Sequence, residues 1–407
     1  MKQSDVVISG GGMVGLTLAL ALARGGLKVV AVDALAPEQT VTADFDGRVS
    51  ALAYAVVRMM QALELWPRLE ANAQPIREIL VSDGAIGRAA SPFSLHFDAE
   101  EVGAESLGHI VENRHIRAAL HAAAAQETNL TLIAPATVAA LRVEPAGVIA
   151  RLSDGREIKA TLAVAADGRD SRLRGQMGIG VIGWSYPQTG IVATVHHARP
   201  HKGVAYEHFL PSGPFAILPM TGDRSSLVWT EAASKAPAML ALDDADFDAE
   251  VAARFGAHLG ENEVVGSRWS YPLKFHLARD YVRPRFALAG DCAHGIHPIA
   301  GQGLNLGLKD VAALAETLLD AARLGQDIGA LDVLKRYERW RRFDSFTLAA
   351  STDALNRLFS NDIAPLRHLR DLGLGLADAF GPARRFFMRH AGGDIGKLPR
   401  LMKGEPA

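Results

Sequence analysis

The sequence predicts an α/β fold in which an α/β domain carries an inserted antiparallel β-sheet domain and is followed by a helical C-terminal region. A strand, a glycine-rich turn, a helix and a second strand open the chain. Alternating apolar runs fill its middle, and long helical patterns follow residue 303. We expect the α/β domain at 1–177 and 272–330, the β-rich domain at 178–271, and C-terminal helices at 331–407.

The opening unit is typical of a Rossmann-like βαβ fold. Gly10, Gly12 and Gly15 fit the pattern G-x-G-x-x-G between a short apolar strand and a buried helix, and the next strand ends on Asp33. Gly10 permits a tight turn, Gly12 lets backbone approach a pyrophosphate, and Gly15 lets the helix pack on the strand. Asp33 is placed to accept hydrogen bonds from the adenosine ribose. The unit therefore predicts a dinucleotide site.

The next segments alternate in predicted type. Helical patterns cover residues 50–65 and 114–126, and a hairpin turning at residues 153–155 ends at Asp167 and Gly168. Residues 178–271 alternate as an antiparallel sheet does, with one acidic helix near 243–259. A second G-x-G-x-x-G there leads into no helix, so we interpret it as a linker.

Composition excludes several classes of function. Charges nearly cancel, with a formal net charge of −2, so the chain has no electrostatic feature that favours nucleic acid. A single cysteine forms no internal disulfide, and the apolar run 13–23 is too short to span a membrane. We therefore expect a cytoplasmic protein.

Residues 290–310 concentrate polar groups and glycines in GDCAHGIHPIAGQGLNLGLKD. His294 and His297 have the H-x-x-H spacing of some metal sites. However, Pro298 and the glycines predict a turn, and no distant cysteine pair completes a ligand set, so no metal is predicted. His294 is expected to be hydrogen-bonded inside the core and Cys292 to fill space, whereas His297 either packs or faces a substrate.

Three motifs in this order resemble the single-component flavin aromatic monooxygenases: G-x-G-x-x-G, the stretch DGRDSRLR from Asp167, and the later Gly290-Asp291. The stretch 297–310 is similar to the signature of the UbiH-type hydroxylases of ubiquinone biosynthesis, and residues 46–52 and 112–120 extend the likeness. The resemblance covers nearly the whole chain. It implies a Rossmann-like domain that binds FAD and a β-rich domain that holds the substrate.

The same resemblance implies a role for each motif. It places the FAD pyrophosphate on residues 10–15, the adenine near Val138, the ribityl chain on Asp291, and both FAD and the nicotinamide cofactor beside Asp167. Further residues are implied to contact the flavin or its phosphates: Met13, Val14, Arg48, Arg114, Gly301, Gln302, Gly303, Leu304 and Asn305. Pro298 is implied to abut the flavin ring, and His297 is the other candidate catalytic residue.

The implied reaction is hydroxylation of a prenylated phenol. NADH or NADPH reduces the flavin, dioxygen forms a flavin hydroperoxide, and one oxygen atom passes to the ring. Three alternatives remain: a hydroxylase of another aromatic metabolite, an FAD-dependent prenyl reductase, and a non-catalytic flavoprotein subunit. Oligomeric state is left open.

For two sets of residues the sequence allows two interpretations. The aromatic side chains of the β-rich region form core or line an apolar substrate pocket: Phe209, Phe215, Trp229 and Tyr271. Arginines alternate with Leu and Phe in the tail, as on a solvated helix or on one that binds a partner or a membrane surface: Arg367, Arg370, Arg384, Arg385 and Arg389.

Overall fold

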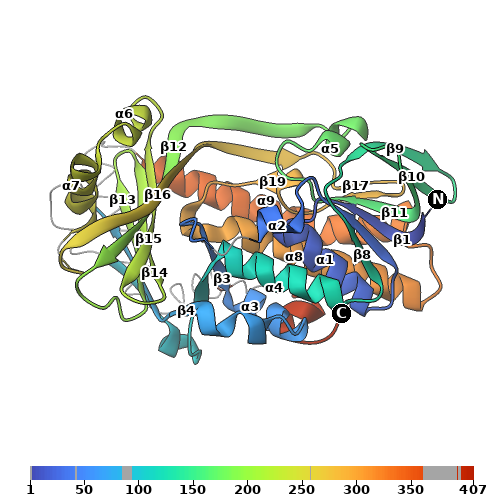
Figure 1. The fold of residues 1–407 in the computed structure, drawn as a ribbon, viewed down its shortest axis with the longest axis horizontal. Helices are drawn as coiled ribbons and strands as arrows, with labels where there is room; N and C mark the ends of the chain where they lie inside the picture. The colour runs from blue at the N-terminus through green and yellow to red at the C-terminus, as the bar shows by residue number, and fades with distance from the viewer. Residues whose placement is uncertain (1, 42–43, 85–93, 257, 361–391, 393–395) are drawn as a thin grey trace.

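The computed structural model describes residues 2–41, 44–84, 94–256, 258–360, 392 and 396–407. Two large sheets lie at opposite ends of the molecule, and long helices run beside and between them (Figure 1). The predicted α/β fold class is confirmed.

The first sheet contains the predicted βαβ unit. Its main order is β17-β18-β11-β1-β2-β8, and β10 and β9 extend it from β11. The strands β18, β11, β1, β2 and β8 pair with one another in parallel, whereas β17 pairs antiparallel with β18. The apolar residues of the parallel strands are buried because helices cover the sheet. Its strands are β1 (Lys2–Ser9), β2 (Val29–Val32), β8 (Leu130–Ile133), β9 (Val138–Glu144), β10 (Gly147–Leu152), β11 (Glu157–Ala165), β17 (Val282–Arg283) and β18 (Phe286–Leu288).

The second sheet has the order β19-β16-β12-β15-β14-β13-β5-β6. Its two longest strands reach from one end of the molecule toward the other (Figure 1). The strands are β5 (Glu78–Asp83), β6 (Ser94–Asp98), β12 (Val181–His197), β13 (Val204–Leu210), β14 (Gly213–Met220), β15 (Arg224–Ala232), β16 (Asn262–Ala278) and β19 (His294–Gly295).

This sheet extends beyond the predicted segment 178–271. β5 and β6 come from the segment assigned to the α/β domain, and β16 crosses the expected boundary at residue 271. β5 joins through parallel pairing with β13, where Val81 lies opposite Glu207. The two strands are more than a hundred residues apart in the chain. Local alternation of apolar and polar residues predicts a strand but does not predict which distant strand it pairs with.

A small third sheet corrects one predicted helix. Residues 50–65 were expected to be helical, but β3 (Val49–Ala53) precedes α3 (Tyr54–Ala62). β3 pairs with β7 (Gly108–Glu112), which also pairs with β4 (Ala73–Ile76). This antiparallel pairing overrides the local helical pattern.

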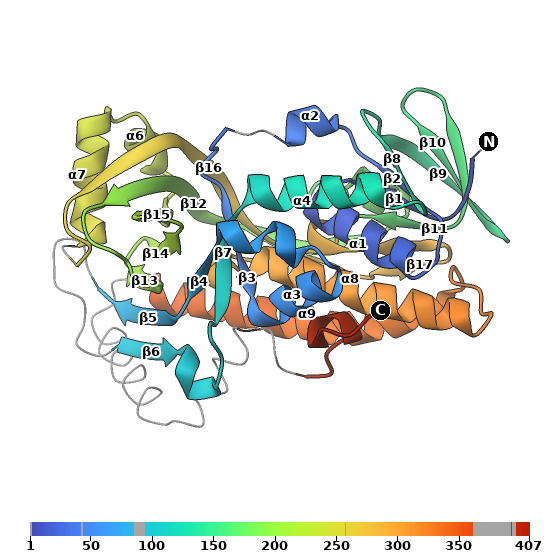
Figure 2. The ribbon, with the colours of Figure 1, turned by 60° about the horizontal axis from the view of Figure 1, so that its bottom comes forward.

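Apart from residues 50–65, the predicted longer helices lie close to their expected positions. α1 packs on α4 and α8, while α9 lies beside α8 and runs along most of the molecule (Figure 2). None of the helices in the described ranges combines the length and apolar character needed to cross a membrane. The α-helices are α1 (Met13–Arg24), α2 (Pro37–Thr40), α4 (Asn113–Gln126), α5 (Arg172–Gln176), α6 (Ala236–Leu240), α7 (Asp244–Phe255), α8 (Gln302–Arg323) and α9 (Leu331–Phe359), besides α3. Short 3₁₀ turns are η1 (Trp66–Arg68), η2 (Glu70–Asn72), η3 (Ala99–Val102), η4 (Gly290–Cys292), η5 (Ile299–Gly301) and η6 (Arg400–Lys403).

Candidate functional site

The glycine turn between β1 and α1 is shaped by close backbone approach. A Cβ atom on Gly10, whose φ is +104°, would lie 2.2 Å from the carbonyl oxygen of Ala166. A Cβ on Gly15 would lie 1.9 Å from the carbonyl oxygen of Gly10, whereas a Cβ on Gly12 would meet no atom within 4 Å. Gly10 and Gly15 are thus required by the fold, and Gly12 faces open space where a ligand can approach the backbone.

Asp33 closes this turn from the end of β2. Its carboxylate accepts from the N–H of Gly11 at 2.5 Å and from the N–H of Leu35 at 2.8 Å. A carboxylate has about four acceptor positions, so lone pairs remain for ribose hydroxyls. The segment leading to Val138 passes beside Asp33, since the N–H of Ala136 donates to the carbonyl of Asp33 at 2.7 Å.

The three sequence motifs meet around the first turn of α1. A Cβ on Gly290 would contact Val14 at 3.0 Å, and a Cβ on Gly307 in α8 would contact the same side chain at 3.0 Å. Met13, at the start of α1, is half-buried against the main core. The tertiary structure therefore gathers the glycine turn, the Gly290-Asp291 loop and the start of α8 in one place.

The Asp167 motif is tied to the Asp291 loop. Ser171 caps α5 by accepting from the N–H of Arg174, and Arg174 donates to the carbonyl of Cys292 at 2.8 Å. Burial raises the pKa of Asp167, and its Oδ1 has no hydrogen-bond partner within the described residues. Asp291 leaves 49% of its side chain exposed, with Arg169 4.0 Å away. Both carboxylates remain able to bind a ligand.

The start of α8 forms a glycine-rich loop. Gly301 adopts a left-handed conformation with φ of +61°, and a Cβ on Gly303 would meet no atom within 4 Å. Asn305 fixes the loop to β3, because its side chain donates to the carbonyl of Ala51 and accepts from the N–H of Ala53, both at 2.9 Å. The first N–H groups of a helix lack intrahelical partners, so this helix end presents donors.

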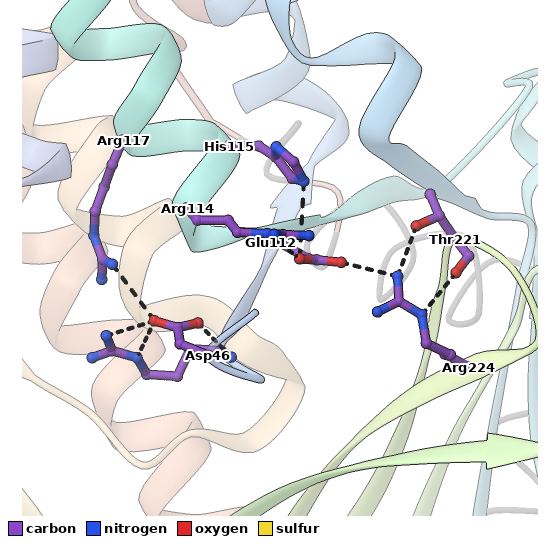
Figure 3. A network of polar contacts seen from close by, with 8 residues as sticks. Asp46, Glu112, Arg114, His115, Arg117, Thr221 and Arg224 are labelled. Atoms are coloured by element: carbon purple, nitrogen blue, oxygen red, sulfur yellow. Dashed lines mark hydrogen bonds and ion pairs between the residues drawn. The ribbon is translucent and has the colours of Figure 1, made fainter. Parts of the chain in front are cut away.

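Four arginines surround two carboxylates between α4 and the second sheet (Figure 3). Asp46 pairs with Arg48 at 2.6 Å and lies 3.7 Å from Arg117. The buried Glu112 pairs with Arg114 at 2.7 Å and with Arg224 at 3.0 Å. Four guanidinium groups against two carboxylates leave two positive charges in excess, which suits phosphate groups.

Arg48 also reaches the second sheet. Its guanidinium lies 5.1 Å from the centre of the Trp269 ring, and the Trp269 indole donates to the carbonyl of Asp46 at 2.6 Å. Sequence reasoning missed Trp269, because this contact joins residues far apart in the chain.

A cavity of about 360 Å³ joins the glycine-rich loop to the second sheet. On one side it is lined by the loop and its neighbours, among them Arg48, Asp291, Pro298, Gly301, Gly303 and Leu304. On the other side lies the sheet face, with Val192, Glu207, Ala216, Leu218, Ser226, Val228, Trp269, Tyr271, Leu273 and Lys274. The sheet side is mostly apolar, and further polar or charged side chains, among them Asn113, Arg169 and His294, also line the cavity. An apolar wall combined with polar groups at defined places is typical of small-molecule sites.

The two candidate histidines differ in their surroundings. His294 is buried and bonds to Asp310, which confirms its expected place in a hydrogen-bonded core. His297 is fully buried and packs edge-on against Tyr186 with ring centroids 5.3 Å apart. Burial lowers the pKa of His297 to about 4, so its ring is neutral at pH 7. Pro298 and His294 line the cavity, whereas His297 is not among the described residues that line it.

The aromatic residues singled out in the β-rich region lie in different environments. Tyr271 lines the cavity, while Phe215 and Trp229 belong to a core on the opposite face of the second sheet, packed against α7. Phe209 packs with Phe359 and Ile299 in a smaller cluster. The interior thiol of Cys292 donates to the carbonyl of Ala165, consistent with its expected space-filling role. The tail arginines at 367–389 lie outside the described residues.

These features fit FAD. The space beside Gly12 and the excess arginines suit a pyrophosphate, and the accessible carboxylate of Asp291 suits a sugar alcohol. The open side of Gly303 and the cavity leave room for a flat ring. The N-terminal end of α8 suits a ring that becomes negatively charged on reduction.

Comparison with known proteins agrees with this fit. The model of the FAD binding domain family matches residues 3–343. The chain is 51% identical to ubiquinone hydroxylase UbiL of Rhodospirillum rubrum, over 100% of this chain and 94% of that protein. It is 34% identical to the 3-demethoxyubiquinol 3-hydroxylase of Escherichia coli, over 96% and 98%.

Solved structures show the same fold. The p-nitrophenol 4-monooxygenase PnpA of Pseudomonas putida superimposes with a TM-score of 0.80 at 18% identity, covering 98% of this chain and 100% of that one. The overall architecture is therefore shared with this monooxygenase. The chain belongs to the family of FAD-dependent monooxygenases that includes the ubiquinone hydroxylases, and FAD is its cofactor.

Proposed function

We propose that the protein hydroxylates the aromatic ring of a prenylated phenol in ubiquinone biosynthesis, with dioxygen and NADH or NADPH as co-substrates. The observation that carries this proposal is the cavity between the glycine-rich loop at the start of α8 and the face of the second sheet, which supports a substrate site beside that loop. Full-length similarity to two hydroxylases of ubiquinone intermediates supports the substrate class.

FAD, when bound, supplies electron transfer from the nicotinamide cofactor and the activation of dioxygen. The protein then has to hold the cofactor, orient the substrate and shield the site from water. In this proposal the backbone at Gly12 and the guanidinium groups of Arg48 and Arg114 hold the pyrophosphate. Asp33 accepts from the adenosine ribose, and Asp291 accepts from the ribityl hydroxyls.

The flavin ring is assigned to the α8 loop. Backbone N–H groups of residues 301–305 would face the electron-rich end of the ring and would stabilise negative charge there. Pro298 would abut the ring, while the neutral, buried ring of His297 packs against Tyr186. Tyr271 and Trp269 close the cavity on the sheet side and limit access of water, which delays wasteful release of hydrogen peroxide.

The test measures oxygen consumption and product together. The FAD-loaded protein receives NADH or NADPH and a prenylphenol. We expect substrate-dependent uptake of dioxygen and a product heavier by one oxygen atom. Saturation of a prenyl double bond without oxygen uptake would instead identify a reductase, and flavin that the nicotinamide cofactor never bleaches would identify a non-catalytic subunit.

A genetic experiment names the substrate. Quinone intermediates are profiled by mass spectrometry in a strain that lacks this protein. The precursor that accumulates shows which ring position is left without its hydroxyl. Normal ubiquinone with no accumulated precursor, in a strain without a second such hydroxylase, would reject the proposed pathway.

We further propose peripheral membrane association through the arginine- and phenylalanine-containing tail, because a prenylated substrate resides in a bilayer. Binding to anionic liposomes is compared between the full chain and a chain that lacks residues 363–407. Loss of binding on truncation is expected, and unchanged binding would remove the tail from this role.

A further inference from the structure

Glu207 is an ionisable residue in the wall of the cavity that the sequence motifs do not explain. It lies on β13 and is 8% exposed. Its carboxyl group makes no hydrogen bond or ion pair with the described residues, and burial is the cause that shifts its pKa. Burying a carboxyl group without a hydrogen-bond partner costs free energy of folding. Such a group therefore needs an explanation, and binding of a ligand is one.

Strand register places Glu207 in a row that crosses five strands. Glu207 lies opposite Ala216, Ala216 opposite Val228, and Val228 opposite Val192. Trp269 completes the row opposite Val192. All five line the cavity, so they share the face of the sheet that looks toward the α8 loop.

The surroundings of Glu207 are apolar on both sides along β13. Phe209 packs in a cluster with Ile299, which precedes the α8 loop. Ala205 packs in another cluster that contacts Val49 and Ala51 of β3. Glu207 is therefore a polar group set into an apolar wall, facing the place where the substrate ring would meet the flavin.

A second polar group lies on the same wall. Ser226 lines the cavity one row away, opposite Leu218 on β14 and Thr194 on β12. The hydroxyl groups of Ser226 and Thr194 are both buried and lack partners among the described residues. Polar atoms left unpaired in the mostly apolar part of a pocket wall indicate where a ligand's polar group binds.

We propose that Glu207 and Ser226 form the polar end of the substrate pocket and bind the ring hydroxyl of the phenol by hydrogen bonds. This inference rests on the proposed function. Anchoring the hydroxyl there fixes which ring carbon faces the α8 loop, so the pair determines the position of hydroxylation.

The protonation state of Glu207 suits this role. Burial raises its pKa to about 8, so the carboxyl group is neutral at pH 7. A neutral carboxylic acid accepts from a phenolic O–H through its carbonyl and donates its own proton to a second oxygen. No unpaired negative charge is then left in the apolar wall.

The test compares two ligands that differ only in the hydroxyl group, an ortho-prenylphenol and the matching prenylbenzene. Their dissociation constants are measured from the change in flavin absorbance of the FAD-loaded protein, without a reductant. Four variants are compared with the unaltered chain: Glu207→Leu, Glu207→Gln, Ser226→Ala and Glu263→Leu. Glu263 is an exposed glutamate of the same sheet and serves as the control.

The unaltered protein is expected to prefer the phenol by about tenfold or more, since a site built for a hydroxyl rejects the ligand that lacks it. Glu207→Leu lowers this ratio to near one, Ser226→Ala lowers it partly, and Glu207→Gln keeps most of it because an amide both donates and accepts. Glu263→Leu leaves it unchanged. A merely structural role for Glu207 would weaken both ligands equally and leave the ratio unaltered.

Two results overturn the inference: an unaltered protein that binds both ligands equally, or a Glu207→Leu protein that keeps the full ratio while retaining FAD. Failure of the proposed function gives a different result. A protein that discriminates the ligands through Glu207 but yields no hydroxylated product retains this binding site and is not the proposed hydroxylase.

Discussion

Replacement of Asp310 by Asn is expected to destabilise the fold and weaken FAD binding. Asp310 is fully buried on α8, and three donors converge on its carboxylate: His294 at 2.5 Å, Arg341 at 2.8 Å and the N–H of Gly290 at 3.0 Å. Asparagine has only one acceptor oxygen, and its NH₂ group would face one of these donors. Arg341, 1% exposed, would keep only Asp344 as an acidic partner among the described residues.

The magnitude follows from removing one member of a buried charge network, which costs about 3–5 kcal/mol. An unfolding entropy of roughly 2.1 cal/mol/K per residue gives roughly 0.85 kcal/mol/K for 407 residues. The Tm should therefore fall by about 4–6 °C. FAD binding weakens because Asp310 fixes Gly290, the neighbour of Asp291.

Thermal unfolding of the FAD-loaded protein measures this effect, and flavin absorbance after gel filtration measures retention. Asp154→Asn is the matched control, because Asp154 pairs with Arg156 in an exposed turn and its loss should leave the Tm unchanged. A Tm for Asp310→Asn within about 1 °C of the unaltered protein would refute the view that this network holds the loop.

Further substitutions separate ligand binding from folding. Asp291→Ala should yield folded, colourless protein, whereas Asp280→Ala, which loses a surface pair with Arg283, should stay yellow; a full flavin spectrum in Asp291→Ala would contradict the assignment. Gly12→Ala should leave the Tm of the flavin-free protein unchanged, because its methyl group meets only open space. It should abolish FAD binding, because that space is the one assigned to the pyrophosphate. Gly15→Ala should fail to fold, since its Cβ would lie 1.9 Å from a carbonyl oxygen; equal behaviour of the two alanine variants in circular dichroism would disprove this distinction. Burial raises the pKa of Glu207 from 4.5 to about 8, so the folded state keeps a proton that the unfolded state releases. Stability should fall as pH rises from 4.5 to 8, and Glu207→Gln should flatten this slope in urea unfolding; an unchanged slope would show that Glu207 does not titrate in this way.

Local sequence predicted the parts of the site that depend on backbone conformation. The glycine turn from Gly10 to Gly15 needs positive φ and close approach, and few other residues satisfy either demand. The long helix that follows residue 303 was likewise predicted from its local helical pattern. Such features leave a signal within a few residues.

The helix expected over residues 50–65 shows where local signals fail. Residues 49–53 pair with β7 and are held by Asn305, which lies about 250 residues away in the chain. The recruitment of β5 beside β13 is likewise a pairing between distant segments. No local propensity competes with such contacts once the chain is folded.

The sequence by itself determined the dinucleotide unit, the order of the flavin motifs and the family, because each is written in short runs of residues with fixed backbone demands. Only the tertiary structure decided how Glu207 and Ser226 face the cavity and how His294, Asp310 and Arg341 join in one buried network. A lone glutamate in an alternating strand gives no sign of burial. Its environment is set by strand register and by the loops that close over the sheet, which exist only in the folded chain.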